Sequence, residues 1–258
     1  MNYGPTLPLS QEIDALKYRQ DGESFVDSIE RLVKHIESEH REAIKEMLLD
    51  QRFLPAGRIR NAVGADKVVT AFNCYVMENI PDSLDGIMDV AKAGALTMKM
   101  GGGTGYNFSQ IRPKGDLIKS VGSMASGPVS YMHIFDATCA TVKSAGERRG
   151  AMMMVLRVDH PDIEEYVDIK TQKGVLENAN ISVAVTKEFM EAVDNDTDFE
   201  LKFEGRVYRT VRATELWDKI MQATWDWAEP GILFIDRINE ENNLWYCETI
   251  SATNPCAK

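Results

Sequence analysis

The sequence predicts an α/β fold with a parallel β-sheet, preceded by a small helical region. In about the first fifty residues, apolar side chains recur at helical spacing. From about Arg52, short apolar runs alternate with amphipathic segments, and glycine-rich turns separate them. This alternation is typical of βα units, whose strands pair in parallel. We therefore expect an N-terminal helical region over residues 1–50 and an α/β domain over residues 51–258.

The N-terminal region is expected to hold helices over residues 24–36 and 43–49, because apolar residues recur there every three or four positions. In the α/β domain, the first strand is expected over 71–77 and is followed by a helix over 82–100, for which Asp82 or Ser83 is a suitable cap.

The remaining elements follow in the same alternation. We expect strands over 104–108, 152–158, 180–186 and 231–235, and helices over 128–143, 162–170 and 214–227. Alternating residues on both sides of Glu204-Gly205 predict an exposed β-hairpin. The strands outside this hairpin together form the predicted parallel sheet.

Composition excludes several classes of protein. The 258 residues carry a formal net charge of −11, which repels nucleic-acid backbones, so no nucleic-acid partner is expected. No apolar run is long enough to cross a membrane, and the first residues lack the pattern of a signal peptide. We therefore expect a cytoplasmic protein without a membrane partner.

The four cysteines are too few for a disulfide scaffold, and no two have the C-x-x-C spacing typical of zinc sites, so no metal site is expected. Cys256 follows Asn254-Pro255 in a polar stretch, whereas Cys74 lies within a predicted strand. Most cysteines of this kind are buried and inert, but a strand cysteine and a loop cysteine can also converge on one site.

Three loops combine glycine with polar or cationic residues. The run Gly101-Gly-Gly-Thr-Gly105 lies between a helix and a strand, the reverse of a dinucleotide-binding motif. The stretch 112–119 contains Arg112 and Lys119, and the loop 143–150 contains the cations Lys143, Arg148 and Arg149. Each loop has an ordinary interpretation as a surface turn. Because all three leave the same predicted sheet, together they favour a phosphate-bearing ligand.

Eight motifs in order resemble the large, catalytic chain of ribonucleotide reductase over about residues 50–257. They are Arg52-Phe-Leu-Pro-Ala-Gly57-Arg, Phe72-Asn-Cys74, Gly101-Gly-Gly-Thr-Gly105, Ser126-Gly-Pro-Val-Ser130, Arg148-Arg-Gly-Ala151, His160-Pro-Asp-Ile163, Pro230-Gly-Ile-Leu-Phe-Ile-Asp236 and Thr253-Asn-Pro-Cys256.

The resemblance implies the first part of a ten-stranded α/β barrel, built from two parallel five-stranded halves, with a central finger loop. Cys256 matches the cysteine whose thiyl radical takes the ribose 3′-hydrogen, after which the 2′-hydroxyl leaves as water. Asn254 matches an asparagine that hydrogen-bonds the substrate hydroxyls. Cys74 matches the first of two cysteines that supply the reducing electrons.

The same resemblance implies binding residues. Positions that match substrate contacts are Arg58, Asn73, Cys74, Gly103 and Asn254. The family also binds an allosteric specificity effector, which is a deoxynucleoside triphosphate or ATP. The matching positions here are Asp82, Ser83, Leu84, Arg112 and Lys119. The loop with Lys143, Arg148 and Arg149 matches the element that relays the identity of the effector to the substrate.

The cofactor and partners also follow from the resemblance. The radical source is either adenosylcobalamin or a separate metal-bearing subunit, and the sequence leaves this choice open. The expected partners are a ribonucleotide substrate, a second copy in a homodimer, a thioredoxin-type reductant and a complementary C-terminal chain.

The sequence departs from the family pattern after Cys256. Lys258 stands where the family has a glutamate that acts as general base, and an ammonium group cannot accept a proton at neutral pH unless its pKa is greatly lowered. No second reducing cysteine is evident. We therefore expect a truncated or split enzyme that is inactive alone. Alternatives are a non-catalytic nucleotide-binding fragment and another thiyl-radical enzyme, such as a glycyl-radical enzyme.

Overall fold

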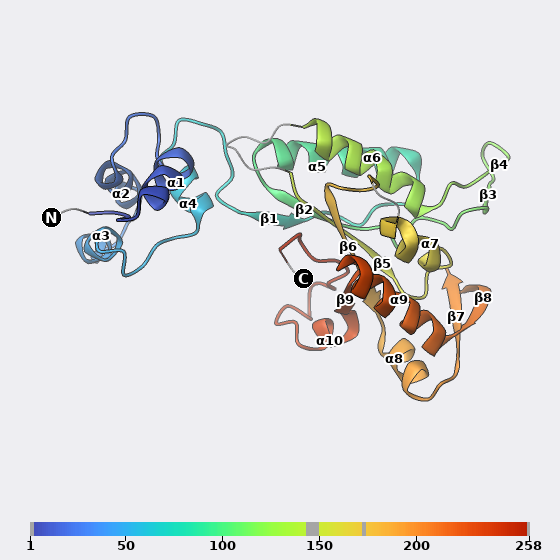
Figure 1. Cartoon of the computed structure of the whole chain (residues 1–258). Helices are drawn as coiled ribbons and strands as arrows, with labels where there is room; N and C mark the ends of the chain where they lie inside the picture. Colours follow the sequence, from blue (N-terminus) through green and yellow to red (C-terminus); the bar gives the residue numbers. More distant parts are fainter. Residues whose placement is uncertain (1–2, 143–149, 172–173, 257–258) are drawn as a thin grey trace. The chain divides into compact units, whose positions relative to one another are not determined.

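The computed structural model describes residues 3–142, 150–171 and 174–256 (Figure 1). The chain divides into two compact units. The first contains the residues up to Asn73 together with Met100–Gly102, and the second contains Cys74–Lys99 and most of the chain from Gly103 onward. The predicted N-terminal helical region, residues 1–50, lies within the first unit.

The first unit is built from four helices: α1 (Pro8–Tyr18), α2 (Phe25–Lys34), α3 (Arg41–Leu49) and α4 (Gly57–Ala62). Helix α2 begins with a capping box, in which the side chains of Ser24 and Asp27 each accept a hydrogen bond from the other residue's backbone N–H. The buried faces of α2 and α3 form a small core of Phe25, Ile29, Leu32, Val33 and Leu48. The helices predicted over 24–36 and 43–49 are confirmed.

Helix α1 was not predicted individually, because it has no buried apolar face. Its buried residue is Asp14, whose carboxylate forms ion pairs with Arg19 and with the buried Arg60. A helix that is held by ion pairs lacks the periodic apolar pattern on which the sequence argument depends.

The second unit contains a five-stranded parallel sheet with the order β1-β2-β5-β6-β9. Its strands are β1 (Cys74–Val76), β2 (Gly103–Asn107), β5 (Met152–Arg157), β6 (Ala179–Val185) and β9 (Gly231–Phe234). All four pairings between neighbours are parallel. The α/β prediction is confirmed, and the described residues form one open half of the expected ten-stranded barrel.

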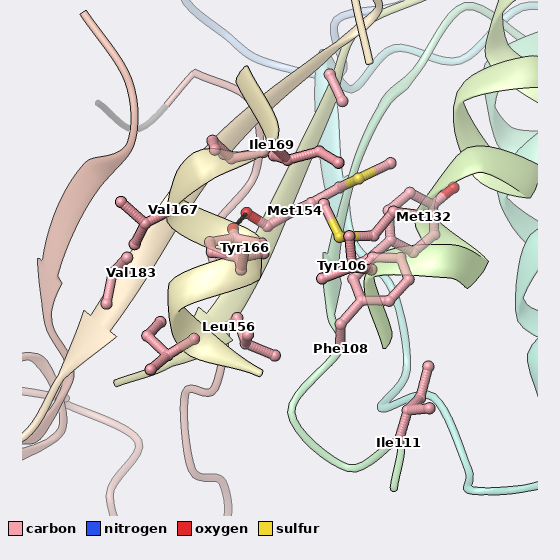
Figure 2. Packing of buried hydrophobic residues seen from close by; sticks show 14 of the residues in the cluster. Tyr106, Phe108, Ile111, Met132, Met154, Leu156, Tyr166, Val167, Ile169 and Val183 are labelled. Carbon is pink, nitrogen blue, oxygen red and sulfur yellow. Dashed lines mark hydrogen bonds between the residues drawn. The ribbon is translucent and has the colours of Figure 1, made fainter. Parts of the chain in front are cut away.

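Four helices connect these strands: α5 (Leu84–Lys99), α6 (Pro128–Thr141), α7 (Ile163–Asp168), which a 3₁₀ turn extends (Ile169–Thr171), and α9 (Ala213–Trp227). Helix α5 begins as predicted, because Ser83 Oγ accepts a hydrogen bond from Gly86 N at 3.1 Å. The large core packs sheet side chains such as Met154 and Leu156 against the helices, and Figure 2 shows Tyr106, Met132 and Tyr166 around them.

The opposite face of the sheet has a separate, smaller core. Met153 and Val155, which alternate with the residues of the large core, pack there with Ala184, Leu233, Ile235 and Ala252. Ala252 belongs to the C-terminal segment, so this face of the sheet is covered in part by the end of the chain.

Six further elements lie outside the five-stranded sheet. Four of them are strands that form two hairpins, β3 (Leu117–Ile118) with β4 (Ser123–Met124) and β7 (Asp198–Phe203) with β8 (Arg206–Arg212), and two are the helices α8 (Lys187–Asp194) and α10 (Ile235–Glu240). The β7–β8 hairpin was predicted. The strands β3 and β4 and the helix α10 are too short to give a periodic pattern, and α8, in which Phe189 is buried, was also not predicted. None of the described helices is both long and apolar enough to cross a membrane.

Candidate functional site

Residues 251–256 run across the sheet face in the direction opposite to β1 and β2. At one end, Ser251 Oγ lies 2.9 Å from Asn79 Oδ1, just beyond the carboxyl end of β1. At the other end, Cys256 Sγ lies 3.0 Å from Sγ of Cys74, the first residue of β1. The segment therefore carries Cys256 to the amino ends of the strands.

Two glycines of β2 leave room for this segment. A Cβ atom at Gly103 would lie 2.8 Å from Pro255 Cγ and 3.2 Å from Cys74 Sγ, and one at Gly105 would collide with the carbonyl oxygen of Thr253. A glycine in a strand often marks such a close approach of another backbone. The glycine run, which the sequence suggested as a ligand loop, thus contains two positions that let the C-terminal segment pack on the sheet.

The tip of the segment is shaped by Asn254. Its Oδ1 accepts a hydrogen bond of 2.9 Å from the backbone N–H of Cys256. Cys256 is exposed and Cys74 is half-buried. The structure therefore brings together four of the predicted residues, Cys256, Asn254, Cys74 and Gly103. Gly105 and Thr253 lie within the quoted motifs, but they were not predicted as site residues.

The other two cysteines have different environments. Cys139 is buried in α6, and burial raises the pKa of its thiol to about 11. Such a thiol stays protonated at neutral pH and is a poor nucleophile. Cys247 is exposed, and its Sγ lies 3.5 Å from the carbonyl oxygen of Leu244.

Arg58 and Asn73, two further predicted substrate contacts, belong to the first unit. Both line a cavity of about 480 Å³ in that unit, together with Lys17, Tyr18 and Lys67. The Arg58 side chain is buried and donates a hydrogen bond to the carbonyl oxygen of Gly101, which has a φ of +90°. A side chain at Gly101 would meet this guanidinium group, so the backbone there requires glycine.

The predicted effector residues gather beyond the carboxyl ends of β1 and β2. Asp82, Ser83, Leu84 and Arg112 line a cavity of about 350 Å³, and Lys119 lines an adjoining cavity of about 590 Å³ that shares Asp82 and Arg112. Asp82 accepts hydrogen bonds from Arg112 N at 3.0 Å and from Arg112 Nε at 2.7 Å.

The arrangement of these cavities suits a nucleotide. The start of helix α5 and the cations Arg112 and Lys119 favour phosphate groups, and the buried Ile87 and Ile111 add an apolar wall. Cavities of a few hundred Å³ with this mixture of polar and apolar lining are typical of small-molecule sites.

The β7–β8 hairpin adds residues that the sequence argument missed. Arg206 and Tyr208 line the cavity that holds Lys119. Tyr208 donates a hydrogen bond of 2.5 Å to Asp116 Oδ2, and the Arg206 guanidinium lies 4.5 Å from the centre of the Tyr208 ring. Tyr208 and Asp116 are 92 positions apart, so no local spacing could have linked them.

Two of the three predicted phosphate loops lie at opposite ends of β2. The last three residues of the glycine run form the amino end of β2, whereas Arg112 and Lys119 follow its carboxyl end. These two loops therefore lie apart, and the phosphate-bearing ligand stays a prediction. Lys143, Arg148 and Arg149, together with Lys258, lie outside the described residues. Within the described ranges, no group of three or more His, Cys, Asp or Glu side chains could hold a metal ion.

Comparison with known proteins identifies the family of this chain. The family model for the ribonucleotide reductase barrel domain matches residues 72–258. This chain belongs to the ribonucleotide reductase family. The chain is 42% identical over 188 residues to the vitamin B12-dependent ribonucleoside-diphosphate reductase of Thermoplasma acidophilum, a match that covers 72% of this chain and 24% of that protein.

A second relative is the vitamin B12-dependent ribonucleoside-diphosphate reductase of Mycobacterium tuberculosis, which is 38% identical over 220 residues, 84% of this chain and 32% of the relative. Among solved structures, the alpha subunit of a class Id ribonucleotide reductase from Actinobacillus ureae superposes with a TM-score of 0.80 at 22% identity, over 98% of this chain and 45% of that one. This ribonucleotide reductase chain thus spans about a quarter to a third of these curated relatives.

Proposed function

We propose that this chain is the N-terminal part of a ribonucleotide reductase catalytic chain and that Cys256 is its radical residue. The observation that carries the proposal is the 3.0 Å approach of Cys256 Sγ to Cys74 Sγ, at the end of a segment that crosses the sheet face. An exposed thiol held beside a second thiol provides both a hydrogen-atom carrier and a source of reducing electrons.

The residues of the thiol site have complementary roles in this proposal. A thiyl radical at Cys256 takes the 3′-hydrogen of the ribose, and Asn254, which holds the Cys256 backbone, also contacts the sugar hydroxyls. The 2′-hydroxyl leaves as water, and its replacement by hydrogen requires two electrons and two protons, which a pair of thiols can supply as it becomes a disulfide. Cys74 is one of these thiols, and Gly103, which lies beside Cys74 and Pro255, is proposed to contact the substrate through its backbone.

The second reducing thiol is proposed to come from a complementary chain. Cys139 is buried with a raised pKa, and Cys247 is hydrogen-bonded beside Leu244 in another part of the second unit. The general base is likewise proposed to come from elsewhere, since Lys258 occupies the expected position of the glutamate. The isolated chain is therefore expected to be inactive.

Adenosylcobalamin is the proposed radical source, because the curated relatives with the higher identities are named as vitamin B12-dependent. This cofactor supplies a carbon-centred radical. The exposed Cys256 thiol fits such a donor, because its hydrogen can be reached from solvent. The alternative, a radical delivered by a separate metal-bearing subunit, would act on the same thiol.

The cavity beside α5 is the proposed site of a deoxynucleoside triphosphate or ATP effector. Asp82, Ser83 and Leu84 at the start of the helix would hold the sugar and phosphates, with Arg112 and Lys119 as counter-charges. The loop with Lys143, Arg148 and Arg149 would relay the identity of the effector to the substrate, and Arg58 and Asn73 would contact that substrate.

We further propose a thioredoxin-type reductant, because a thiol pair that is oxidised in each turnover must be reduced again. A homodimer and a cytoplasmic location are also proposed.

A two-component assay tests this function. The chain is mixed with the C-terminal polypeptide of the Thermoplasma relative, adenosylcobalamin, a dithiol and a ribonucleoside diphosphate, and the 2′-deoxynucleotide is quantified by chromatography. We expect product only when both polypeptides are present. Product from the isolated chain would contradict the need for a complementary chain, and absence of product with both polypeptides would contradict the reductase assignment.

A non-catalytic nucleotide-binding role is the second candidate. The observation that favours it is the position of the effector cavity at the carboxyl ends of the strands, away from the thiols at the amino ends. Calorimetric titration with deoxynucleoside triphosphates separates the candidates, because binding without any two-component activity would support this second role. Absence of binding would count against both.

A further inference from the structure

The two thiols of the candidate site are placed to react with each other. Their sulfur atoms are 3.0 Å apart, about 1 Å more than the roughly 2.05 Å of a disulfide bond. Cys74 is fixed in β1, which pairs with β2 from its first residue, whereas Cys256 lies exposed near the end of the described chain. A small movement of the Cys256 end would therefore bring the sulfurs to bonding distance.

We propose that Cys74 and Cys256 form an intramolecular disulfide when the chain meets a low-molecular-weight disulfide such as oxidised glutathione. This is an oxidation site within the chain itself, distinct from any pairing of Cys74 with a second reducing cysteine. It depends on the thiol geometry alone and would hold even if Cys256 were not a radical residue.

The reaction is a pair of thiol–disulfide exchanges. The thiolate of the exposed Cys256 attacks the small disulfide, forms a mixed disulfide and releases one small thiol. The Cys74 thiolate then attacks Cys256 Sγ, the mixed bond breaks, and the second small thiol leaves. Cys74 and Cys256 lose two electrons and two protons in total, and the small disulfide gains both as two thiols.

The other cysteines do not compete well for this reaction. Burial raises the pKa of Cys139 to about 11, which keeps it protonated, and its side chain is only 5% exposed. Cys247 is exposed, but its Sγ contacts the carbonyl oxygen of Leu244 and not another sulfur. Pro255 packs close to the α-carbon of Gly103, which itself pairs with Cys74, so the Cys256 end is held beside its partner.

The disulfide would have a functional consequence that rests on the proposed function. A sulfur bonded to Cys74 carries no hydrogen that a radical source can remove. The oxidised chain would therefore be unable to start radical chemistry until a dithiol reduced it, so that the reductant would control both turnover and activation.

Peptide mapping tests the inference on the whole chain. The reduced protein is incubated in a buffer of oxidised and reduced glutathione, quenched with acid, alkylated and digested with trypsin and Glu-C. Cleavage after Lys67, Glu78 and Glu248 gives the peptides 68–78 and 249–258, which contain Cys74 and Cys256 respectively. We expect these two peptides joined, lighter by two hydrogens than their sum, and about tenfold more abundant than any other pair because neighbouring thiols have a high effective concentration.

The variants give matched controls. Cys247→Ser should form the same linked peptides, whereas Cys74→Ser should accumulate a glutathione mixed disulfide at Cys256. The inference is overturned if the wild-type chain carries mainly glutathione at Cys256 or links Cys247 to either thiol. The wild-type digest alone decides the outcome, so a variant that folds poorly does not affect it.

Discussion

The packing of the C-terminal segment on β2 predicts a large effect from adding one methyl group at Gly105. In Gly105→Ala, the new Cβ would collide with the Thr253 carbonyl oxygen, so residues 252–256 must move away from the sheet. This movement would also expose the buried Ala252, which packs in the smaller core. Overpacking of this kind typically costs about 1–3 kcal/mol in the free energy of unfolding.

Two readouts separate loss of stability from loss of the site. Urea unfolding gives the change in free energy, and the yield of the Cys74–Cys256 disulfide in glutathione buffer reports the position of the segment. The control is Gly205→Ala in the β7–β8 turn, where φ is +78° and the added Cβ meets open space. This control should lose roughly 1–2 kcal/mol from left-handed backbone strain yet keep the disulfide yield.

The expected pattern is therefore specific to position. Gly105→Ala should lose both stability and cross-linking, and Gly205→Ala only stability. If Gly105→Ala formed the disulfide as readily as the wild type, the proposed path of residues 251–256 over β2 would be refuted.

Three further predictions concern the cavity beside α5 and the buried thiol. Arg112→Gln should raise the Kd for deoxynucleoside triphosphates about ten- to a hundredfold in calorimetry, since charge-assisted hydrogen bonds contribute about 1.5–3 kcal/mol. Arg209→Gln, which removes a cation paired with Glu164, should leave the Kd unchanged, and equal affinities of the two variants would argue against this cavity. Tyr208→Phe removes the hydrogen bond to Asp116 and should lower the free energy of unfolding by about 0.5–1.5 kcal/mol. It should also weaken nucleotide binding. Tyr246→Phe, at an exposed position, should change neither the stability nor the affinity. Burial raises the pKa of Cys139 from 9.0 to about 11, so the unfolded chain releases this proton at lower pH than the folded chain does. The free energy of unfolding should therefore fall as the pH rises from 9 through 11. This fall should be smaller in Cys139→Ala than in Cys247→Ala, and identical pH profiles of the two variants would contradict the assigned pKa.

Much of the fold could be predicted from local pattern. The buried strands β5 and β6 are continuous apolar runs, and the Ser83 cap marks the start of α5. Helix α1 could not be predicted in this way, since it is anchored by Asp14 and two arginines instead of an apolar face. Short elements such as β3 and β4 contain too few residues to show any period.

The candidate site was predictable only where motifs identified the family. Resemblance assigned Cys74 and Cys256 to the same reaction, but the reason for Gly105 became evident only when Thr253, almost 150 positions later, was found against it. The contribution of Arg206 and Tyr208 to the second cavity depends on how the β7–β8 hairpin folds toward residues 112–120. Local spacing contains no information on such long-range contacts.

Cys256 is proposed to carry the radical chemistry of this family member. The most direct measurement is formation of 2′-deoxynucleotide by the two-component mixture containing adenosylcobalamin and a dithiol, with Cys256→Ser compared with Cys247→Ser. We predict that Cys247→Ser forms product at the wild-type rate and that Cys256→Ser forms none, because a hydroxyl group is a far poorer hydrogen-atom donor than a thiol. Product formation by Cys256→Ser at the wild-type rate would contradict the claim.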